Sequence, residues 1–180
     1  MIDSTDDNLM LEIQKGNQAA CQTLVEQHLP ALRRFAVRLL GNTSEAEDAL
    51  QETFLRVWTR ANQWQPGRSK LTTWLHRIMH NICIDYLRKK GPWVEEPLTE
   101  HHRAPQNLEQ EQDVSSQTHR VFKAMQMLPE RQRTAIILCY YQGFSNQETA
   151  EILGVSVSAL ESLLARGRRT LREQLLGEAV

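Results

Sequence analysis

The chain has 180 residues, of which 41 % are hydrophobic, enough to bury one ordinary core or two small helical ones. Its formal net charge is only −1, so the chain as a whole lacks the basic excess typical of nucleic-acid binders. The start of the chain is acidic and has no signal-peptide pattern, and no apolar run approaches the length that crosses a bilayer. These features predict a cytoplasmic protein with no segment inserted into a membrane.

Charged residues are distributed unevenly along the chain. Basic residues gather in two segments, at Arg77, Arg88, Lys89 and Lys90 and again at Arg166, Arg168, Arg169 and Arg172. Acidic residues gather between these segments, at Glu95, Glu96, Glu100, Glu109, Glu111 and Asp113. Two basic segments joined by an acidic one can still bind a polyanion, despite the net charge near zero.

The first half of the chain predicts helices, because apolar residues recur every three or four positions and no long alternation indicates strands. A first helix at Asn8–Lys15 ends at Gly16, and a second, longer helix ends at Gly41. The run Ser44-Glu45-Ala46-Glu47 fits a capping box, which predicts a third helix extending to about Ala61 with one continuous apolar face.

A fourth helix follows the polar break at residues 63–69 and ends where Gly91 and Pro92 stop it. Its apolar stripe includes Trp74, for which we therefore favour a core position. Residues 91–116 contain three prolines, many acidic residues and few apolar ones, a composition typical of a linker. The sequence thus predicts an all-α protein with two small helical domains, residues 1–90 and 117–180, joined by an acidic linker.

The second domain contains the pattern of a helix-turn-helix. It divides into four helices, with breaks at Pro129, Gly143 and Gly154. The run Ser145-Asn146-Gln147-Glu148 is a capping box that starts a short helix, and Gly154 supplies the positive φ that ends it. Ser156 then caps the next helix after a turn of suitable length. A small Ala150 at the crossing of the two helices favours this module over an ordinary helical hairpin.

The second helix of this module is predicted to enter the major groove. Its N-terminal and outer residues would meet base edges, and its arginines would meet phosphates, adding affinity that falls with salt. For the arginines, the alternative is a solvated helix end placed favourably against the helix dipole. The residues concerned are Ser156, Val157, Ser158, Glu161, Ser162, Ala165, Arg166, Arg168 and Arg169.

Several motifs resemble those of a known family. The run Asp48-Ala49-Leu50-Gln51-Glu52-Thr53-Phe54 with Trp58, followed by Thr73-Trp74-Leu75-His76-Arg77-Ile78 and by Asp85-Tyr86-Leu87-Arg88-Lys89-Lys90, resembles regions 2.2 to 2.4 of sigma-70 family sigma factors. The run Leu128-Pro129-Glu130-Arg131-Gln132-Arg133 and the helix-turn-helix after it resemble region 4. With a short acidic linker in place of region 3, the chain resembles the extracytoplasmic-function (ECF) group. The resemblance covers about residues 17–90 and 121–175.

The resemblance implies a factor that binds core RNA polymerase, recognises promoter DNA and helps to open it, without catalysing a reaction. In the family the third helix docks on a coiled coil of the core enzyme, which implies core binding by Asp48, Gln51, Glu52, Phe54 and Arg56. The fourth helix binds the minus-10 element, which implies contacts from Trp64, Arg68, Lys70, His76, Arg77, Asn81, Arg88 and Lys89. The helix-turn-helix would read the minus-35 element. A solvated acidic face is the alternative for Asp48 and Glu52.

Glu161 departs from the family pattern, which commonly has a basic residue at this position. A carboxylate can accept from the amino group of cytosine but repels phosphate, so the minus-35 preference of typical relatives does not transfer directly.

Family members are often held by an anti-sigma factor, and we expect such a partner here. The main rival interpretation is a stand-alone helix-turn-helix repressor or activator, which leaves the motifs of the first domain unexplained. An enzyme with an incidental helix-turn-helix is the second rival.

We expect no cofactor, metal site, catalytic residue or small-molecule substrate. Cys21, Cys83 and Cys139 lie far apart and in no ligand spacing, so they are interpreted as buried, small apolar residues. The adjacent His101 and His102 are more typical of exposed side chains than of a metal site.

Overall fold

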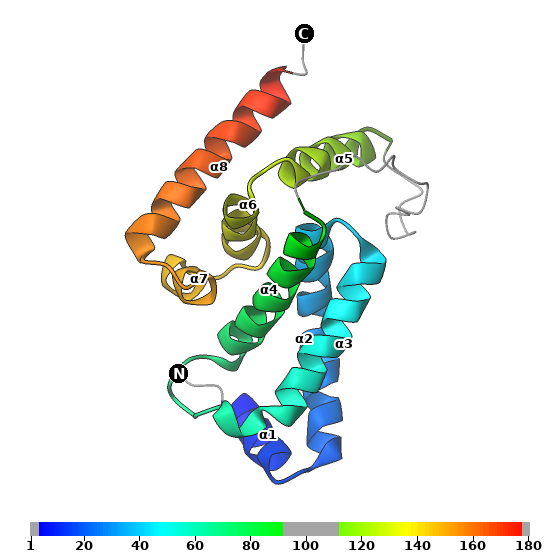
Figure 1. The fold of residues 1–180 in the computed structure, drawn as a ribbon, viewed down its shortest axis with the longest axis vertical. Helices are drawn as coiled ribbons and strands as arrows, with labels where there is room; N and C mark the ends of the chain where they lie inside the picture. Colours follow the sequence, from blue (N-terminus) through cyan, green and yellow to red (C-terminus); the bar gives the residue numbers. More distant parts are fainter. Residues whose placement is uncertain (1–3, 92–111, 178–180) are drawn as a thin grey trace.

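The computed structural model describes residues 4–91 and 112–177, and every regular element in this part of the chain is helical (Figure 1). The all-α prediction is therefore confirmed. Eight α-helices are α1 (Ser4–Gln14), α2 (Gln18–Leu40), α3 (Thr43–Thr59), α4 (Leu71–Lys89), α5 (Gln112–Gln126), α6 (Glu130–Ile136), α7 (Asn146–Leu153) and α8 (Val157–Gly177). A 3₁₀ turn η1 (Ala61–Gln63) and a π-helical turn η2 (Ile137–Tyr141) complete the described elements. His101, His102 and most of the predicted acidic linker lie outside the described residues.

Helices α1 to α4 form the N-terminal half of the molecule. Helices α2, α3 and α4 pack against one another, and α1 lies across the end that carries η1 (Figure 1). The predicted apolar stripes meet in this core, where Leu24, Phe35, Leu50 and Leu75 are fully buried or nearly so. None of the described helices combines the length and the hydropathy of a membrane-spanning segment.

The cap of α3 differs from the predicted one. Asn42, rather than Ser44, precedes the helix in an extended conformation, and its Oδ1 accepts from the backbone N–H of Glu45 at 3.0 Å. The preceding Gly41 ends α2 with a left-handed φ of 69°, so the chain turns directly into the Asn42 cap and Ser44 lies inside the helix. The capping box predicted at Ser44 is therefore wrong.

Other element boundaries also differ. Helix α1 begins at Ser4 rather than Asn8, and α5 begins at Gln112, inside the range predicted as linker. Of the three cysteines, Cys83 is buried as expected, whereas Cys21 and Cys139 are only partly buried.

Helices α5 to α8 form the C-terminal half, and its predicted helix-turn-helix is present. Ser145 and Glu148 form both hydrogen bonds of the capping box, and Gly154 ends α7 with a φ of 65°. Ser156 caps α8, since its Oγ accepts from the N–H of Ala159 at 3.1 Å. Helix α6 approaches α8 closely at Gly167, where a Cβ atom would stand 2.7 Å from Cδ1 of Ile136.

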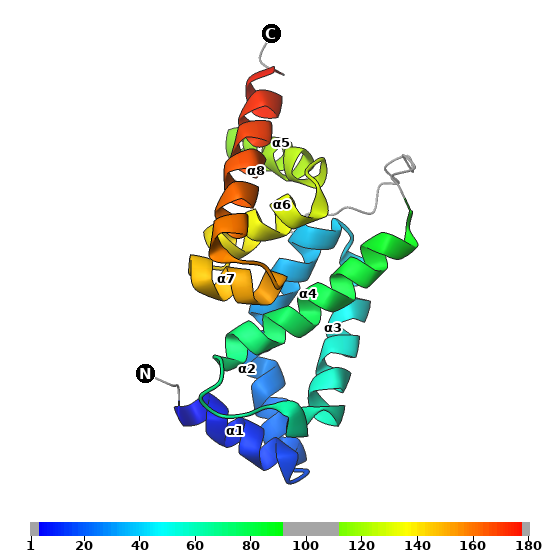
Figure 2. The ribbon, with the colours of Figure 1, turned by 60° about the vertical axis from the view of Figure 1, so that its left-hand side comes forward.

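The two halves pack against each other. Figures 1 and 2 both show α7 beside α4, and η2 and α6 also contact α2. At the end of α2, Nε2 of Gln126 donates to the carbonyl of Arg38 at 2.7 Å. The Arg38 guanidinium in turn lies 4.6 Å from the centre of the Tyr141 ring. The two halves are therefore held together by specific contacts between described residues.

Candidate nucleic-acid and polymerase interfaces

One exposed stripe runs along the outer side of α3. Helical spacing of three and four residues brings its members to one side, away from the buried face. This α3 stripe consists of Ser44, Asp48, Gln51, Leu55 and Thr59. It contains two of the residues predicted to bind the core enzyme, Asp48 and Gln51.

Leu55 is the apolar member of this stripe, and the sequence analysis did not assign it to the core-binding set. Its side chain is 61 % exposed, although leucine is usually buried in helical cores. The signal was present in the sequence, because Leu55 lies outside the apolar stripe of its own helix. An apolar side chain between polar neighbours is the usual composition at the centre of a protein-binding surface.

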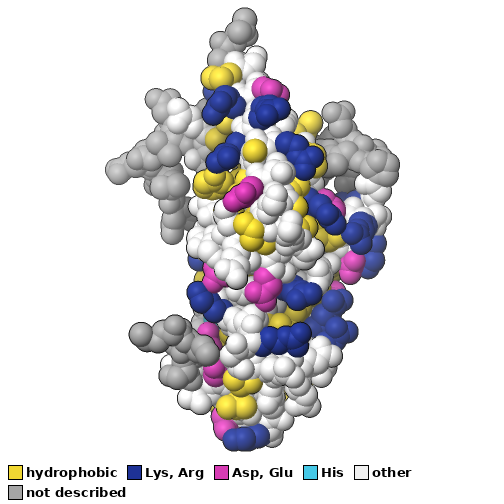
Figure 3. Space-filling model, turned by 90° about the vertical axis from the view of Figure 1, so that its left-hand side faces the viewer, with side chains coloured by type: hydrophobic (Ala, Val, Ile, Leu, Met, Phe, Trp, Pro, Cys, Tyr) yellow, Lys and Arg dark blue, Asp and Glu magenta, His cyan; other side chains and the backbone are white. Residues whose placement is uncertain are grey.

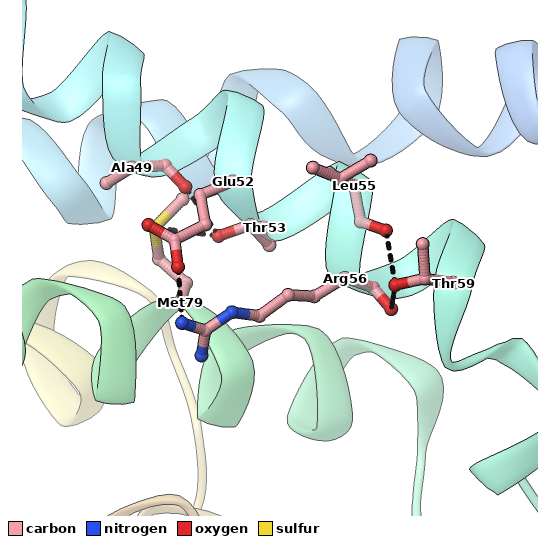
Figure 4. A network of polar contacts seen from close by, with 7 residues as sticks. All are labelled: Ala49, Glu52, Thr53, Leu55, Arg56, Thr59 and Met79. Carbon is pink, nitrogen blue, oxygen red and sulfur yellow. Dashed lines mark hydrogen bonds and ion pairs between the residues drawn. The ribbon is translucent and has the colours of Figure 1, made fainter.

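The other predicted core-binding residues lie differently. Glu52 and Arg56 form an ion pair with each other on the side of α3 that looks toward α4 (Figure 4). Both border a cleft between the two helices that Tyr86 and Lys89 also line. Phe54 is half-buried and packs against the core. The predicted set is therefore split between an exposed stripe and an internally paired group.

The structure ties α3 to α4 beneath this pair. Oγ1 of Thr53 donates to the carbonyl of Ala49 at 2.7 Å and lies 3.4 Å from Sδ of Met79 (Figure 4). Thr53 and Met79 are both fully buried. The orientation of the α3 stripe is thus fixed by the core and not by flexible surface side chains.

The residues predicted to bind the minus-10 element divide into exposed and buried groups. The exposed group, which the structure leaves accessible, consists of Arg68, Lys70, Arg77, Asn81, Arg88 and Lys89. Trp64 and His76 are buried, with 3 % and 4 % of their surfaces exposed. Both rings are therefore covered in this structure.

Trp64 is buried because η1 folds beneath α1. Its ring centre lies 5.6 Å from that of Trp74, which packs against the core as expected. Nε2 of Gln14 in α1 donates to the carbonyls of Ala61 and Trp64 at 3.0 and 3.1 Å. A large aromatic ring held in this way stabilises the start of the loop that leads to α4.

His76 lies between the two halves of the molecule. Its ring centre is 5.5 Å from that of Phe35 in α2 and 4.7 Å from that of Phe144, in the loop before α7. Burial is the main cause that lowers the pKa of His76 to about 4, and the charge of His28 adds to it. The hydrogen bond between Nδ1 and the carbonyl of Thr72, at 2.8 Å, opposes the shift. His76 is thus a neutral, covered ring in this arrangement.

Lys70 is exposed but has a partner in the other half. Its Nζ lies 2.7 Å from a carboxylate oxygen of Glu148. This hydrogen-bonded ion pair raises the pKa of Lys70 and lowers that of Glu148. A residue predicted to contact DNA is therefore paired with an acidic residue of the helix-turn-helix.

All nine residues predicted to read the minus-35 element are exposed on α8 or at its cap, from Ser156 to Arg169. We call this surface the α8 face. Lys and Arg side chains follow the side of the molecule that carries α8 and continue over the half below it (Figure 3). Sequence reasoning missed Tyr140, which is 56 % exposed and whose hydroxyl accepts from Nη1 of Arg168 at 3.0 Å. Tyr140 thereby positions one of the arginines.

Comparisons with known proteins agree with this division into two halves. The family model for sigma-70 region 2 matches residues 24–92, and the model for sigma-70 region 4 matches residues 118–171. The ECF RNA polymerase sigma factor SigW of Bacillus subtilis is 33 % identical over 175 residues, covering 91 % of this chain and 93 % of that protein. SigE of Mycolicibacterium smegmatis, also an ECF RNA polymerase sigma factor, is 38 % identical over 167 residues. That match covers 89 % of this chain and 64 % of SigE.

Solved structures of similar proteins include complexes with partners. CnrH, solved with the cytosolic domain of CnrY, matches with a TM-score of 0.74 and 28 % identity, over 96 % of this chain and 98 % of that one. The sigma factor RpoE of Bartonella quintana, solved with the anti-sigma factor NepR, matches with a TM-score of 0.68 and 30 % identity, over 86 % of this chain and 95 % of that one. The chain therefore belongs to the ECF sigma factors of the sigma-70 family.

Proposed function

We propose that this protein binds core RNA polymerase in the cytoplasm, directs it to promoters and helps to open them, without being an enzyme itself. The observation that carries the proposal is the presence of two exposed surfaces of different chemistry in one chain. The α3 stripe is suited to a protein, and the α8 face is suited to a DNA groove. A stand-alone repressor needs only the second surface.

The α3 stripe has the composition of a protein-binding surface. Leu55 supplies an exposed apolar side chain, and Asp48 and Gln51 supply polar groups beside it. Binding energy at interfaces is usually concentrated in a few such central side chains, surrounded by a polar rim. We therefore assign Leu55 to the core-binding set, together with Asp48 and Gln51.

The α8 face has the composition of a groove reader. Small residues such as Ser158 and Ala165 allow the helix to approach base edges, and Arg166 and Arg169 can meet phosphates beside the groove. Glu161 is a carboxylate on the same face, so the surface binds DNA weakly on its own. Polymerase bound to the α3 stripe would deliver this face to DNA and compensate for its modest affinity.

A protein of the anti-sigma class is the regulator that we propose for this chain. RpoE, which matches over 86 % of the chain, was solved bound to the anti-sigma factor NepR. The match to CnrH, solved with the cytosolic domain of CnrY, extends over 96 % of the chain. Both likenesses support a protein partner for this chain.

Transcription in vitro tests the proposal. The protein is incubated with sigma-free core polymerase and a library of promoter fragments, and run-off transcripts are sequenced. We expect transcripts that depend on the protein and start at a common sequence. Tight and specific DNA binding by the protein alone, with no transcripts, would instead indicate a repressor or activator.

Substitutions on the α3 stripe test its assignment. Asp48→Arg combined with Leu55→Asp reverses one charge and places another at the centre of the stripe. Both side chains are exposed, so we expect the helical circular dichroism to be unchanged and co-elution with core polymerase to be lost. The matched control is Glu26→Arg, a charge reversal at an exposed position of α2. Unchanged co-elution of the double variant would remove the stripe from the binding surface.

A further inference from the structure

The side of α4 that points away from the N-terminal core is buried. Leu75, Met79 and Ile82 face that core. With 3.6 residues per turn, Thr73 and His80 point to roughly the opposite side of the helix. They are nevertheless only 1 % and 7 % exposed. Since α7 packs along α4, the C-terminal half is what covers this side, which we call the outer side of α4.

At these two positions on the outer side of α4, Oγ1 of Thr73 and Nδ1 of His80 are buried and have no hydrogen-bond partner among the described residues. A buried polar group without a partner costs about 1–3 kcal/mol, so permanent interfaces pair such groups or replace them with apolar ones. Burial also lowers the pKa of His80 to about 4, with the charges of Arg131 in α6 and Arg88 in α4 contributing. The outer side of α4 thus has the chemistry of a surface that meets a polar ligand in another state.

Residues 142–148 of the C-terminal half present two groups to residues predicted to bind the minus-10 element. The Phe144 ring meets His76 edge to face, with an interplanar angle of 71°. The Glu148 carboxylate pairs with Lys70. The amide of Gln142 anchors the segment, since its Nε2 donates to the carbonyl of Ala31 in α2 at 3.3 Å. The Phe144 ring and the Glu148 carboxylate thus contact His76 and Lys70 in the way that an unstacked base and a phosphate would contact them.

We propose that, in the free protein, residues 142–148 occupy the outer side of α4 and compete there with promoter DNA. This inference rests on the proposed function, because it takes α4 as the minus-10 reader. The same segment contains the cap of α7, so the docked helix-turn-helix is held against the N-terminal half. Separation of the two halves then exposes α4 and frees the α8 face to find its own DNA site. Only the separated fraction binds DNA, which lowers the apparent affinity of the free protein.

Histidine titration and DNA binding together test this competition in the full chain. The variant combines Gln142→Ala, Phe144→Ala and Glu148→Gln, in which glutamine preserves an acceptor for the capping box. The matched control is Leu176→Ala, an exposed apolar truncation in the C-terminal half. The imidazole pKa of His80 is followed by NMR, and binding of fluorescent single-stranded DNA of mixed sequence is followed by anisotropy. Circular dichroism confirms that both proteins are folded, and Gln142→Ala alone serves as a milder loop variant.

We expect the pKa of His80 to be near 4 in the wild type and in the control, and to rise toward 6.5 in the variant. The affinity for single-stranded DNA is expected to rise on the order of tenfold with it. A wild-type pKa near 6.5 would overturn the docked arrangement. No gain in affinity once His80 has shifted, including no binding by either protein, would overturn the competition. Run-off transcription reports separately on the proposed function, because it does not depend on how His80 titrates in the free protein.

Discussion

At the scale of single residues, Glu161 is the side chain on the α8 face with the sharpest consequence for sequence choice. It is exposed near the start of α8, where a groove-reading helix meets base edges. We expect Glu161→Gln to raise the affinity of the polymerase holoenzyme for duplex DNA and to change the preferred base pair at one position. Selection from a randomised minus-35 library measures both, and discrimination should change by about 1–3 kcal/mol at that position. Glu173→Gln, at the far end of α8, is the control. Identical selected sequences would show that Glu161 does not face the bases.

Arg168 is expected to act on phosphate and not on sequence. Arg168→Ala should weaken binding of the holoenzyme to all promoters similarly and reduce the slope of log affinity against log salt by about 1. Tyr140→Phe, which removes the hydroxyl that holds this guanidinium, should produce a smaller change in the same direction. A titration of binding against potassium chloride distinguishes these effects. A slope that Arg168→Ala leaves unchanged would contradict the phosphate contact.

Residue exposure could be predicted where a local signal fixes the register of a helix. The caps at Ser145, Gly154 and Ser156 mark where α7 begins and ends and where α8 begins, and all nine predicted residues are exposed. Trp64 lacked such a signal, because it lies between two glutamines in a run that resembles a loop. Its burial depends on α1 and η1, which approach it only in the folded chain. His76 is covered by a residue 68 positions away (144 − 76), which periodicity cannot indicate.

At the scale of elements, the cap of α3 can be tested directly. Asn42→Ala removes the side chain that accepts from the N–H of Glu45 and should lower the free energy of unfolding by about 1 kcal/mol. Ser44→Ala alters an exposed position inside the helix and should change it by roughly 0.5 kcal/mol at most. Urea denaturation of the two variants compares them with the wild type. The reverse order of stabilities would restore Ser44 as the cap.

Helix existence was easier to predict than helix ends. The apolar stripe of α3 required a helix wherever it began, whereas its first residue depended on a choice between Asn42 and Ser44 as caps. The left-handed Gly41 decides this choice, because it ends α2 immediately before Asn42 and leaves no room for a longer turn. The apolar periodicity therefore predicted that α3 exists and which side of it is exposed. The connection between α2 and α3 determined the residue at which α3 begins.

At the scale of the whole molecule, the contact between the two halves was not predictable from the sequence. Each half shows its own apolar periodicity, and the buried apolar residues of both halves belong to one core cluster. The contacts between the halves also include isolated polar pairs, such as Gln142 to Ala31 and Lys70 to Glu148. These pairs join residues far apart in the chain and have no periodic pattern. The apolar periodicity of each half predicts its helices and their buried faces. The docked arrangement, which that periodicity does not predict, couples the binding surfaces of the two halves.

This coupling should make stability depend on pH through His76 and His80. Both have a pKa near 4 in the folded chain, against 6.5 for an unperturbed histidine. A depressed histidine pKa means that the unfolded chain binds protons more readily. The associated stability is therefore complete above about pH 6.5 and is lost progressively as the pH falls toward 4. Glu148, whose pKa is lowered from 4.5, loses its contribution only at still lower pH.

Urea denaturation at about pH 7.5 and at about pH 5.5 isolates the histidines from the carboxylates. We expect the free energy of unfolding to be lower at the acidic pH by about 1 kcal/mol for each buried histidine. His80→Gln should abolish part of this difference, because glutamine does not titrate. His119→Gln, an exposed histidine on α5, should leave it intact. Equal stability of the wild type at the two pH values would mean that neither imidazole is covered in solution. It would then favour separated halves and an exposed outer side of α4 in the free protein.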